Sequence, residues 1–213
     1  MATSTKSSTS GSTNSMGRWL IIAAGVAVVV ILILAVVLTG GDSSDVAPED
    51  EFGSPQVDGQ LPPLTDPAAD AAVGMVAPDL AGEDFDGNAV AITNDGEAKA
   101  IVFLAHWCPH CQNEVPAVQG WLDDGGGVEG VAIYSVSTSM DETRVNWPAS
   151  AWLEDEGWTS PVIRDDQAGT AMISFGGNAF PYWVFVNSDG TVAGRVAGAI
   201  PTDQLEEIMQ SLT

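Results

Sequence analysis

A Cys-x-x-Cys pair, placed between an apolar run and a helical pattern, constrains the fold of this chain more than any other feature. The apolar run at residues 100–105 has the length and composition of a buried strand. Pro109 suits the first turn of the following helix because it lacks a backbone N–H. Cys108 is therefore predicted at the helix start, where unpaired N–H groups and the helix dipole stabilise a thiolate. Cys111 is predicted one turn deeper, as a shielded thiol. Strand, dithiol and helix in this order indicate redox chemistry rather than a structural crosslink.

The charge of the chain is strongly negative and unevenly distributed. The sequence has 29 Asp and Glu against 6 Lys and Arg, a net charge of −23. All the acidic residues follow residue 40, and only four basic residues accompany them: Lys99, Arg144, Arg164 and Arg195. Such a surface repels nucleic acid and anionic headgroups, so a nucleic-acid-binding role is excluded. We interpret the acidic surface as a solubility feature.

The N-terminal part predicts a membrane anchor. Residues 1–18 are rich in Ser, Thr and Gly and are expected to form a disordered cytoplasmic tail. Residues 19–38 carry no charge and are long enough for one transmembrane helix. A cleaved signal peptide would have a shorter apolar region and a better cleavage site than the one at residues 39–41. Basic residues precede the span and acidic residues follow it, which places the N-terminus in the cytosol and the remainder outside.

The rest of the chain divides into a linker and a folded domain. Residues 39–73 are rich in Pro, Ala and Asp and are expected to form a flexible acidic linker. The domain is predicted at residues 74–213. It starts with a hairpin around Asp86-Gly87-Asn88, and it ends with a helix that has Asp203 as its N-cap. Strands are predicted between these elements at 100–105, 131–136, 161–163, 182–186 and 191–196, with helices from Pro109 and around Trp152. This alternation implies a mixed sheet covered on both faces.

Four features of the domain resemble the thioredoxin superfamily, and more closely its membrane-tethered TlpA/ResA-like branch. They are the Trp107-Cys108-x-x-Cys111 motif, Pro116 five residues later, Phe180-Pro181 before a strand, and the turn at residues 187–190. The starting hairpin and an insertion at about 139–160 favour that branch over plain thioredoxin. The resemblance implies an α/β, thioredoxin-like fold for residues 74–213: a mixed central sheet flanked by helices, with an N-terminal hairpin, preceded by one transmembrane helix. It implies no cofactor.

The resemblance also assigns roles to individual residues. Pro181 matches a proline that is cis and packs against the dithiol, and Phe180 would offer backbone groups to a substrate by strand addition. Glu114 matches a carboxylate that relays the proton of the buried thiol; the position of the buried Asp in plain thioredoxin is Val102 here. Trp107, Pro109 and His110 would modulate the dithiol.

The two histidines near the dithiol have different predicted roles. His110 lies between the cysteines, where an imidazole favours a thiolate and makes the pair more oxidising. His106 is interpreted as a surface residue. Metal binding is the main alternative function, because these histidines and both cysteines could bind copper or zinc. Their close spacing on one strand-to-helix turn makes tetrahedral coordination awkward, so no metal is assigned.

A single residue excludes haem attachment, and another excludes peroxiredoxin chemistry. Haem attachment needs a histidine where Gln112 stands, and a peroxiredoxin needs a threonine where Ala105 stands. A structural disulfide is disfavoured because a four-residue ring removes little chain entropy.

The sequence therefore predicts a membrane-anchored, extracytoplasmic thiol–disulfide oxidoreductase that acts on protein thiols and disulfides. The redox-active disulfide would join Cys108, the attacking thiol, to Cys111, the resolving thiol. A membrane or extracytoplasmic redox partner would reset it. The resemblance to the TlpA/ResA-like branch favours a reductase, whereas His110 favours an oxidase. The direction of disulfide exchange therefore stays open.

Overall fold

A five-stranded mixed sheet is the central layer of the computed structural model, which describes residues 51–212. Its strand order is β6-β5-β4-β7-β8. The strands are β4 (Ala98–Leu104), β5 (Val131–Ser137), β6 (Val162–Arg164), β7 (Tyr182–Val186) and β8 (Val192–Ala197). β4 is parallel to β5 and β5 to β6, whereas β7 is antiparallel to both β4 and β8. The predicted mixed sheet is thus confirmed.

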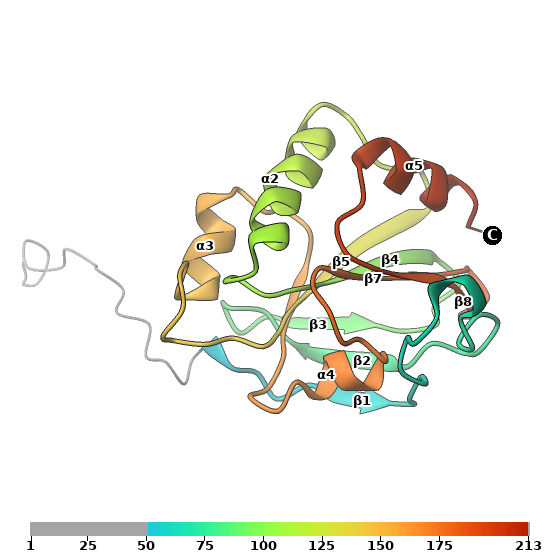
Figure 1. The fold of residues 1–213 in the computed structure, drawn as a ribbon, viewed down its shortest axis with the longest axis horizontal. Coiled ribbons are helices and arrows are strands. Elements are labelled where there is room, and N and C mark those ends of the chain that lie inside the picture. The colour runs from blue at the N-terminus through green and yellow to red at the C-terminus, as the bar shows by residue number, and fades with distance from the viewer. Residues whose placement is uncertain (1–50, 213) are drawn as a thin grey trace, which may run out of the picture. The chain divides into compact units, whose positions relative to one another are not determined.

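Three helices cover one face of this sheet (Figure 1). They are α2 (Pro109–Asp123), α3 (Ala149–Asp155) and α5 (Thr202–Gln210). The apolar cluster between them and the sheet includes Ala100, Val102, Leu104, Val115, Val118, Trp152, Leu153, Trp183, Phe185, Leu205 and Met209. β4 is buried along its whole length, because alternate side chains point to opposite faces and both faces are covered. That is why residues 100–104 of this strand read as an unbroken apolar run.

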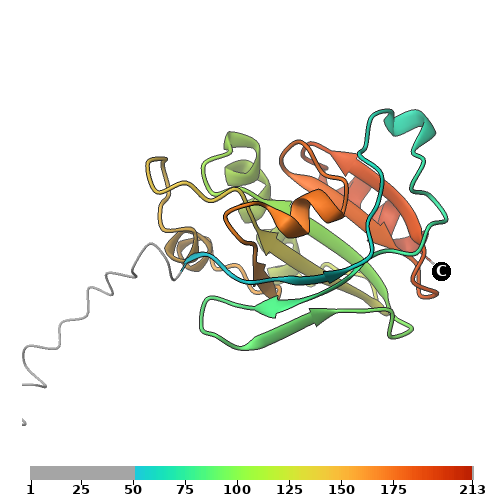
Figure 2. The same ribbon diagram turned by 90° about the horizontal axis from the view of Figure 1, so that it is seen from below.

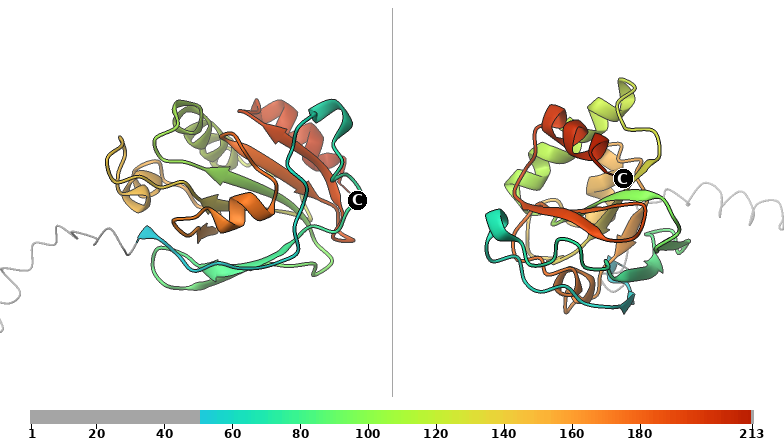
Figure 3. Two further views of the ribbon diagram at one scale, coloured as in Figure 1. Left: turned by 60° about the horizontal axis from the view of Figure 1, so that its bottom comes forward. Right: turned by 90° about the vertical axis from the view of Figure 1, so that its right-hand side faces the viewer.

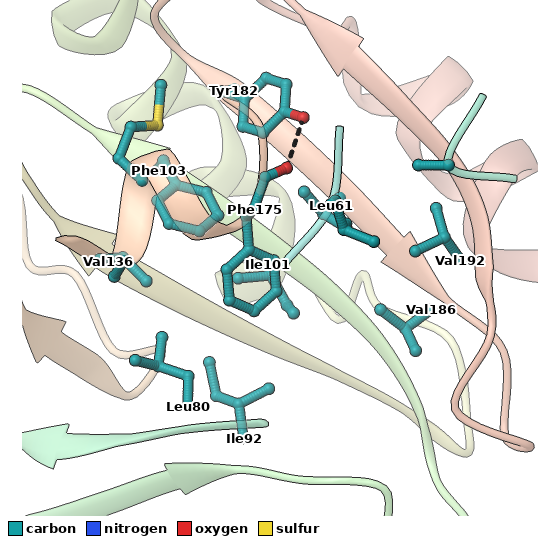
Figure 4. Packing of buried hydrophobic residues seen from close by; sticks show 14 of the residues in the cluster. Leu61, Leu80, Ile92, Ile101, Phe103, Val136, Phe175, Tyr182, Val186 and Val192 are labelled. Carbon is teal, nitrogen blue, oxygen red and sulfur yellow. Dashed lines mark hydrogen bonds between the residues drawn. The ribbon is translucent and has the colours of Figure 1, made fainter. Parts of the chain in front are cut away.

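The opposite face is covered by a smaller sheet and a short helix (Figures 1 and 3). The small sheet is antiparallel, with β1 (Gln56–Asp58), β2 (Asp79–Glu83) and β3 (Ala89–Ile92) in that order, and the helix is α4 (Thr170–Ser174). Figure 4 shows the core of this side, where Phe103 lies against Phe175 and Tyr182 at ring-centroid distances of 5.3 and 5.8 Å. The Tyr182 hydroxyl donates to the Phe175 carbonyl at 3.0 Å, so this buried polar group has a partner.

The prediction of a flexible linker at residues 39–73 is wrong for residues 51–73, which are folded onto the domain (Figure 2). This segment contains β1 and a 3-10 helix, η2 (Pro67–Ala69). Leu61, Leu64 and Ala72 are buried in the core beside α4 and the large sheet. Their irregular spacing gives no periodic signal, because an extended chain follows the surface and inserts single side chains into it.

A buried ion pair holds the same segment in place. The Arg195 guanidinium on β8 forms two bonds to the Asp70 carboxylate, one of them from Nε to Oδ2 at 2.9 Å. It also donates from Nη1 to the carbonyls of Pro62 and Phe175 at 2.8 and 3.1 Å. Neither side chain of the pair is more than 4% exposed. A paired charge with its donors satisfied is the form in which a buried arginine is tolerated.

One further prediction differs from the structure, and one short helix was not predicted. Asp203 does not cap the last helix: α5 begins at Thr202 after Pro201, and the Asp203 carboxylate accepts only from the N–H of Gln204. α4 was not predicted, because five residues are too few for a helical period. The predicted tail at 1–18, the predicted span at 19–38 and the linker residues before 51 lie outside the described residues. Among residues 51–212, no helix combines the length and apolar character needed to cross a bilayer.

Candidate active site

The two cysteines lie at the start of α2, where the strand-to-helix pattern predicts them. Cys108 is the N-cap residue, with φ −78° and ψ 119°, and Pro109 begins the helix. The Cys108 carbonyl accepts the first hydrogen bond of the helix, from the N–H of Gln112 at 3.0 Å. Cys108 is 6% exposed and Cys111 is fully buried, and both are thiols. Cys108 is therefore the thiol at the rim of the site and Cys111 the one beneath it.

The loop before β7 brings a second segment to the dithiol. The Phe180–Pro181 peptide bond is cis, as the resemblance implies, and Pro181 is buried. The Cys108 Sγ donates to the Phe180 carbonyl oxygen at 3.6 Å. Two segments that are 72 residues apart in the sequence thus meet at the reactive sulfur.

Glu114 lies on the buried face of α2, one helical turn beyond Cys111, and is 4% exposed. Its Oε1 accepts from the indole N–H of Trp183 at 3.1 Å and from the N–H of Ile200 at 2.7 Å. Its Oε2 is buried without a hydrogen-bond partner among the described residues. Burial raises the pKa of this carboxyl to about 7, although both donors act to lower it. Near neutral pH, Glu114 can therefore both accept and release a proton.

Cys111 holds its proton strongly. Burial is the main cause that raises the pKa of this thiol far above its ordinary value, and the nearby Cys108 and Glu114 raise it further. A thiol in this state needs a base before it can act as a nucleophile. The pair thus consists of one thiol at the helix start and one that depends on proton transfer.

Comparison with known proteins places this dithiol in a family. Residues 73–195, more than half of the chain, match the AhpC/TSA family. The chain belongs to the AhpC/TSA family. The matched range includes β4, the dithiol, Glu114 and the cis-proline.

The relatives of this AhpC/TSA protein agree with the predicted TlpA/ResA-like branch of the thioredoxin superfamily. It is 23% identical over 125 residues to sporulation thiol-disulfide oxidoreductase A of Bacillus subtilis, covering 58% of this chain and 73% of that one. It is 26% identical over 147 residues to the thiol-disulfide oxidoreductase ResA of Oceanobacillus iheyensis, covering 66% and 72%. The crystal structure of StoA from Bacillus subtilis superposes with a TM-score of 0.52 at 22% identity, covering 64% and 98%. The predicted family resemblance and the enzyme class, thiol–disulfide oxidoreductase, are thereby confirmed.

Trp107 forms one wall of the site in this AhpC/TSA protein. Its indole N–H donates to the Ser139 carbonyl at 2.7 Å, and its ring meets the Phe180 ring edge-on at 5.9 Å. The Arg144 guanidinium lies over the same ring at 4.4 Å from its centroid, in a cation–π arrangement. Pro109 and His110 are exposed on the first turn of α2. Sequence reasoning missed Ser139 and Arg144, because nothing in a motif marks a loop that returns to the site.

His106 is not a surface residue, contrary to the prediction. It is fully buried, and its two ring nitrogens face the backbone of the loop between β5 and α3. The position two residues after a fully buried strand was the signal for this burial. These ring contacts also remove His106 from any ligand set. Among residues 51–212, no three His, Cys, Asp or Glu side chains gather closely enough to hold a metal ion.

Proposed function

We propose that this protein is a membrane-tethered, extracytoplasmic enzyme that exchanges disulfides with protein substrates through Cys108-Pro109-His110-Cys111. One observation carries the proposal: a thiol at the rim of the helix start, above a buried thiol and a buried carboxyl. The thiol–disulfide oxidoreductases among the relatives support the same chemistry. Protein substrates are inferred from the loop at Phe180, which lies beside the reactive sulfur.

The reductive half-reaction has two exchange steps. The Cys108 thiolate attacks a substrate disulfide, so a Cys108–substrate disulfide forms and one substrate thiolate leaves. The Cys111 thiolate then attacks the Cys108 sulfur, so the Cys108–Cys111 disulfide forms and the second substrate thiolate leaves. The protein dithiol is oxidised by two electrons and the substrate disulfide is reduced. The oxidative reaction runs through the same steps in reverse.

Glu114 supplies the proton transfer that the second step needs. Cys111 must lose a proton before it attacks, and burial opposes this loss. Glu114 is one turn away and has an oxygen without a partner among the described residues, and its pKa of about 7 suits a base near neutral pH. We therefore assign to Glu114 the acceptance of the Cys111 proton and its return in the reverse direction.

The substrate docks across the loop that carries the cis-proline. The Phe180 carbonyl accepts from the Cys108 thiol, so an extended substrate segment that pairs with this backbone would hold its own sulfur close to Cys108. Trp107 packs against Phe180 and shapes the same edge of the site. Pro109 and His110 are exposed beside Cys108, where they would tune the stability of its thiolate.

The tether is proposed from the sequence of the segment before the described residues. Residues 19–38 would span the membrane, residues 1–18 would stay in the cytosol, and the chain from 39 to 50 would lead to the domain. The redox partner that resets the dithiol would act on the extracytoplasmic side.

Trapping of mixed disulfides tests the proposed chemistry. Cys111→Ser removes the resolving thiol, so we expect substrate proteins to accumulate as covalent adducts on Cys108. Cys108→Ser removes the attacking thiol at the rim, so we expect few adducts or none. Non-reducing gels of the tagged full-length variants measure both. Equal trapping by the two variants would refute the assignment of the two thiols.

A further inference from the structure

His106 connects the active-site turn to the loop between β5 and α3, residues 138–148, which we call the β5–α3 loop. Its Nε2 accepts from the N–H of Asp141 at 3.1 Å, so this nitrogen carries no proton. Its Nδ1 lies 2.8 Å from the Val145 carbonyl and must therefore be the nitrogen that donates. The ring is thus neutral, with its proton on Nδ1. One imidazole spans the two limbs of the loop.

The β5–α3 loop needs such a support. Ser139 and Asn146 have φ values of 50° and 59°, in the left-handed region that costs energy for residues other than glycine. Val145 is 64% exposed, so burial of its own side chain does not hold it in place. The imidazole of His106, which is itself fully buried, supplies bonds to both limbs between these points.

The loop in turn holds Trp107. The Ser139 carbonyl accepts the indole N–H, and the Arg144 guanidinium covers the indole ring. Trp107 and residues 139–143 line a groove of about 580 Å³ together with Phe52 and Gln167. The groove begins at the residue next to Cys108. The position of the loop therefore determines one wall of the surface that a substrate meets.

We propose that His106 is a positioning residue that fixes the β5–α3 loop against Trp107 and so shapes the substrate groove, and that its protonation releases the loop. This inference rests on the proposed function, because it concerns how the same site holds its substrate. An imidazolium donates from both nitrogens, so protonation turns the Asp141 N–H contact from attractive to repulsive. The groove is thus formed when His106 is neutral and loosened when it is charged.

The groups that face His106 decide where this change occurs. Burial lowers the pKa of His106 below its ordinary value and Arg144 lowers it further, although the Val145 carbonyl, Glu51 and Asp141 act to raise it. Glu51 is itself held by the N–H and hydroxyl of Ser150 at 3.0 and 2.5 Å. The loop is therefore fixed at neutral pH and released in acid, below the ordinary histidine pKa of about 6.5.

Kinetics of the full-length protein against insulin, with dithiothreitol as reductant, test the proposal. For His106→Leu we expect the KM for insulin to rise about five- to tenfold, the effect of losing one or two hydrogen bonds. The rate with the small disulfide 5,5′-dithiobis(2-nitrobenzoate) should stay within about twofold, because that reagent does not need the groove. The wild-type KM should rise from pH 7.5 to 5, whereas that of His106→Leu should stay flat. His106→Asn keeps a donor for Val145 and should restore part of the low KM.

Controls and contrary outcomes separate this inference from the proposed function. His110→Gln should keep the acid-induced rise in KM, because His110 is exposed and the ring bonds to the loop belong to His106. Hydrogen exchange of residues 139–147 should accelerate in His106→Leu and, to a lesser degree, in His106→Asn. An unchanged KM with unchanged exchange in His106→Leu would overturn the inference, as would a parallel loss of both disulfide reactions. Failure of the wild type to exchange with protein disulfides and with protein thiols alike would instead refute the proposed function.

Discussion

The buried carboxyl group of Glu114 links the chemistry of single residues to the stability of the fold. Its pKa rises from 4.5 to about 7, so the folded protein favours the protonated form. The protonated carboxyl contributes its full stabilisation, relative to the charged form, below pH 4.5, where the folded and unfolded states are both protonated. This stabilisation is lost as the pH rises through 7, because only the folded state then carries the cost of a buried charge. This single group should lower the free energy of unfolding by roughly 3 kcal/mol across that interval.

Glu114→Gln checks this assignment by its pH dependence. The free energy of unfolding, measured by denaturant titration at pH 4.5 and 8, should change less between the two pH values in the variant than in the wild type. Comparing the two pH values within each protein cancels the cost of the buried amide. The same variant should slow the resolution of a mixed disulfide by about a hundredfold or more, since it cannot accept the Cys111 proton. Normal resolution in Glu114→Gln would contradict the proposed proton transfer.

His110 is the residue whose substitution addresses the direction of exchange. We expect the His110 imidazole to stabilise the Cys108 thiolate, and therefore the reduced protein. For His110→Pro we expect the reduction potential to fall by a few tens of millivolts, since 30 mV corresponds to about 1.4 kcal/mol for two electrons. Equilibration with glutathione measures both proteins. A wild-type potential at or below the −270 mV or so of thioredoxin, unchanged by the substitution, would contradict the oxidising role of His110 and support a reductase.

The segment of residues 51–73 contributes a strand and a core side chain to the fold. It adds β1 to the small sheet and inserts Leu61 into the core at 1% exposure. Leu61→Ala should lower the free energy of unfolding by about 2–4 kcal/mol, through lost burial and the cavity it leaves. Val73→Ala is the matched control, because Val73 is 54% exposed, and it should change stability by less than about 0.5 kcal/mol. Equal, small effects of both would mean that this segment does not belong to the cooperative fold.

Elements with a local signal could be predicted from the sequence, and those held by distant contacts could not. β4 and α2 carry an apolar run, a proline start and a glycine stop within a few residues. β1 has three residues and exists because it pairs with β2, more than twenty residues away. α4 is capped by Asp165 and Asp166, whose carboxylates accept from Ala171 and Thr170 at 2.9 Å, and this signal is too short to stand out.

The same distinction holds inside the active site. The motif alone places Cys108 and Cys111, and the helical spacing places Glu114 on the turn below them. The burial of His106 could not be derived in this way, because its partners lie 35 and 39 residues further along the chain. The role of the β5–α3 loop therefore becomes visible only in three dimensions.

The topology of the whole molecule is tested by protease added to intact cells. We propose from the charge-free span at 19–38 and the acidic residues after it that everything beyond residue 39 lies outside. We therefore expect the protease to release the C-terminal domain and to leave a short membrane-bound fragment. The discovery of a secreted product that starts near residue 40 would show instead that the span is a cleaved signal.

The burial of Arg195 has a consequence for how quickly this molecule meets others. Side-chain exposure is 0% for Arg195, 3% for Lys99 and 11% for Arg164, so of the basic residues between 51 and 212 only Arg144, at 52%, reaches well into solvent. The charged side chains exposed on that part of the chain are thus almost all acidic. Cationic proteins should encounter it faster at low ionic strength, and added salt, which screens charge beyond about 8–10 Å, should slow them. A neutral small disulfide should react at the same rate in either buffer.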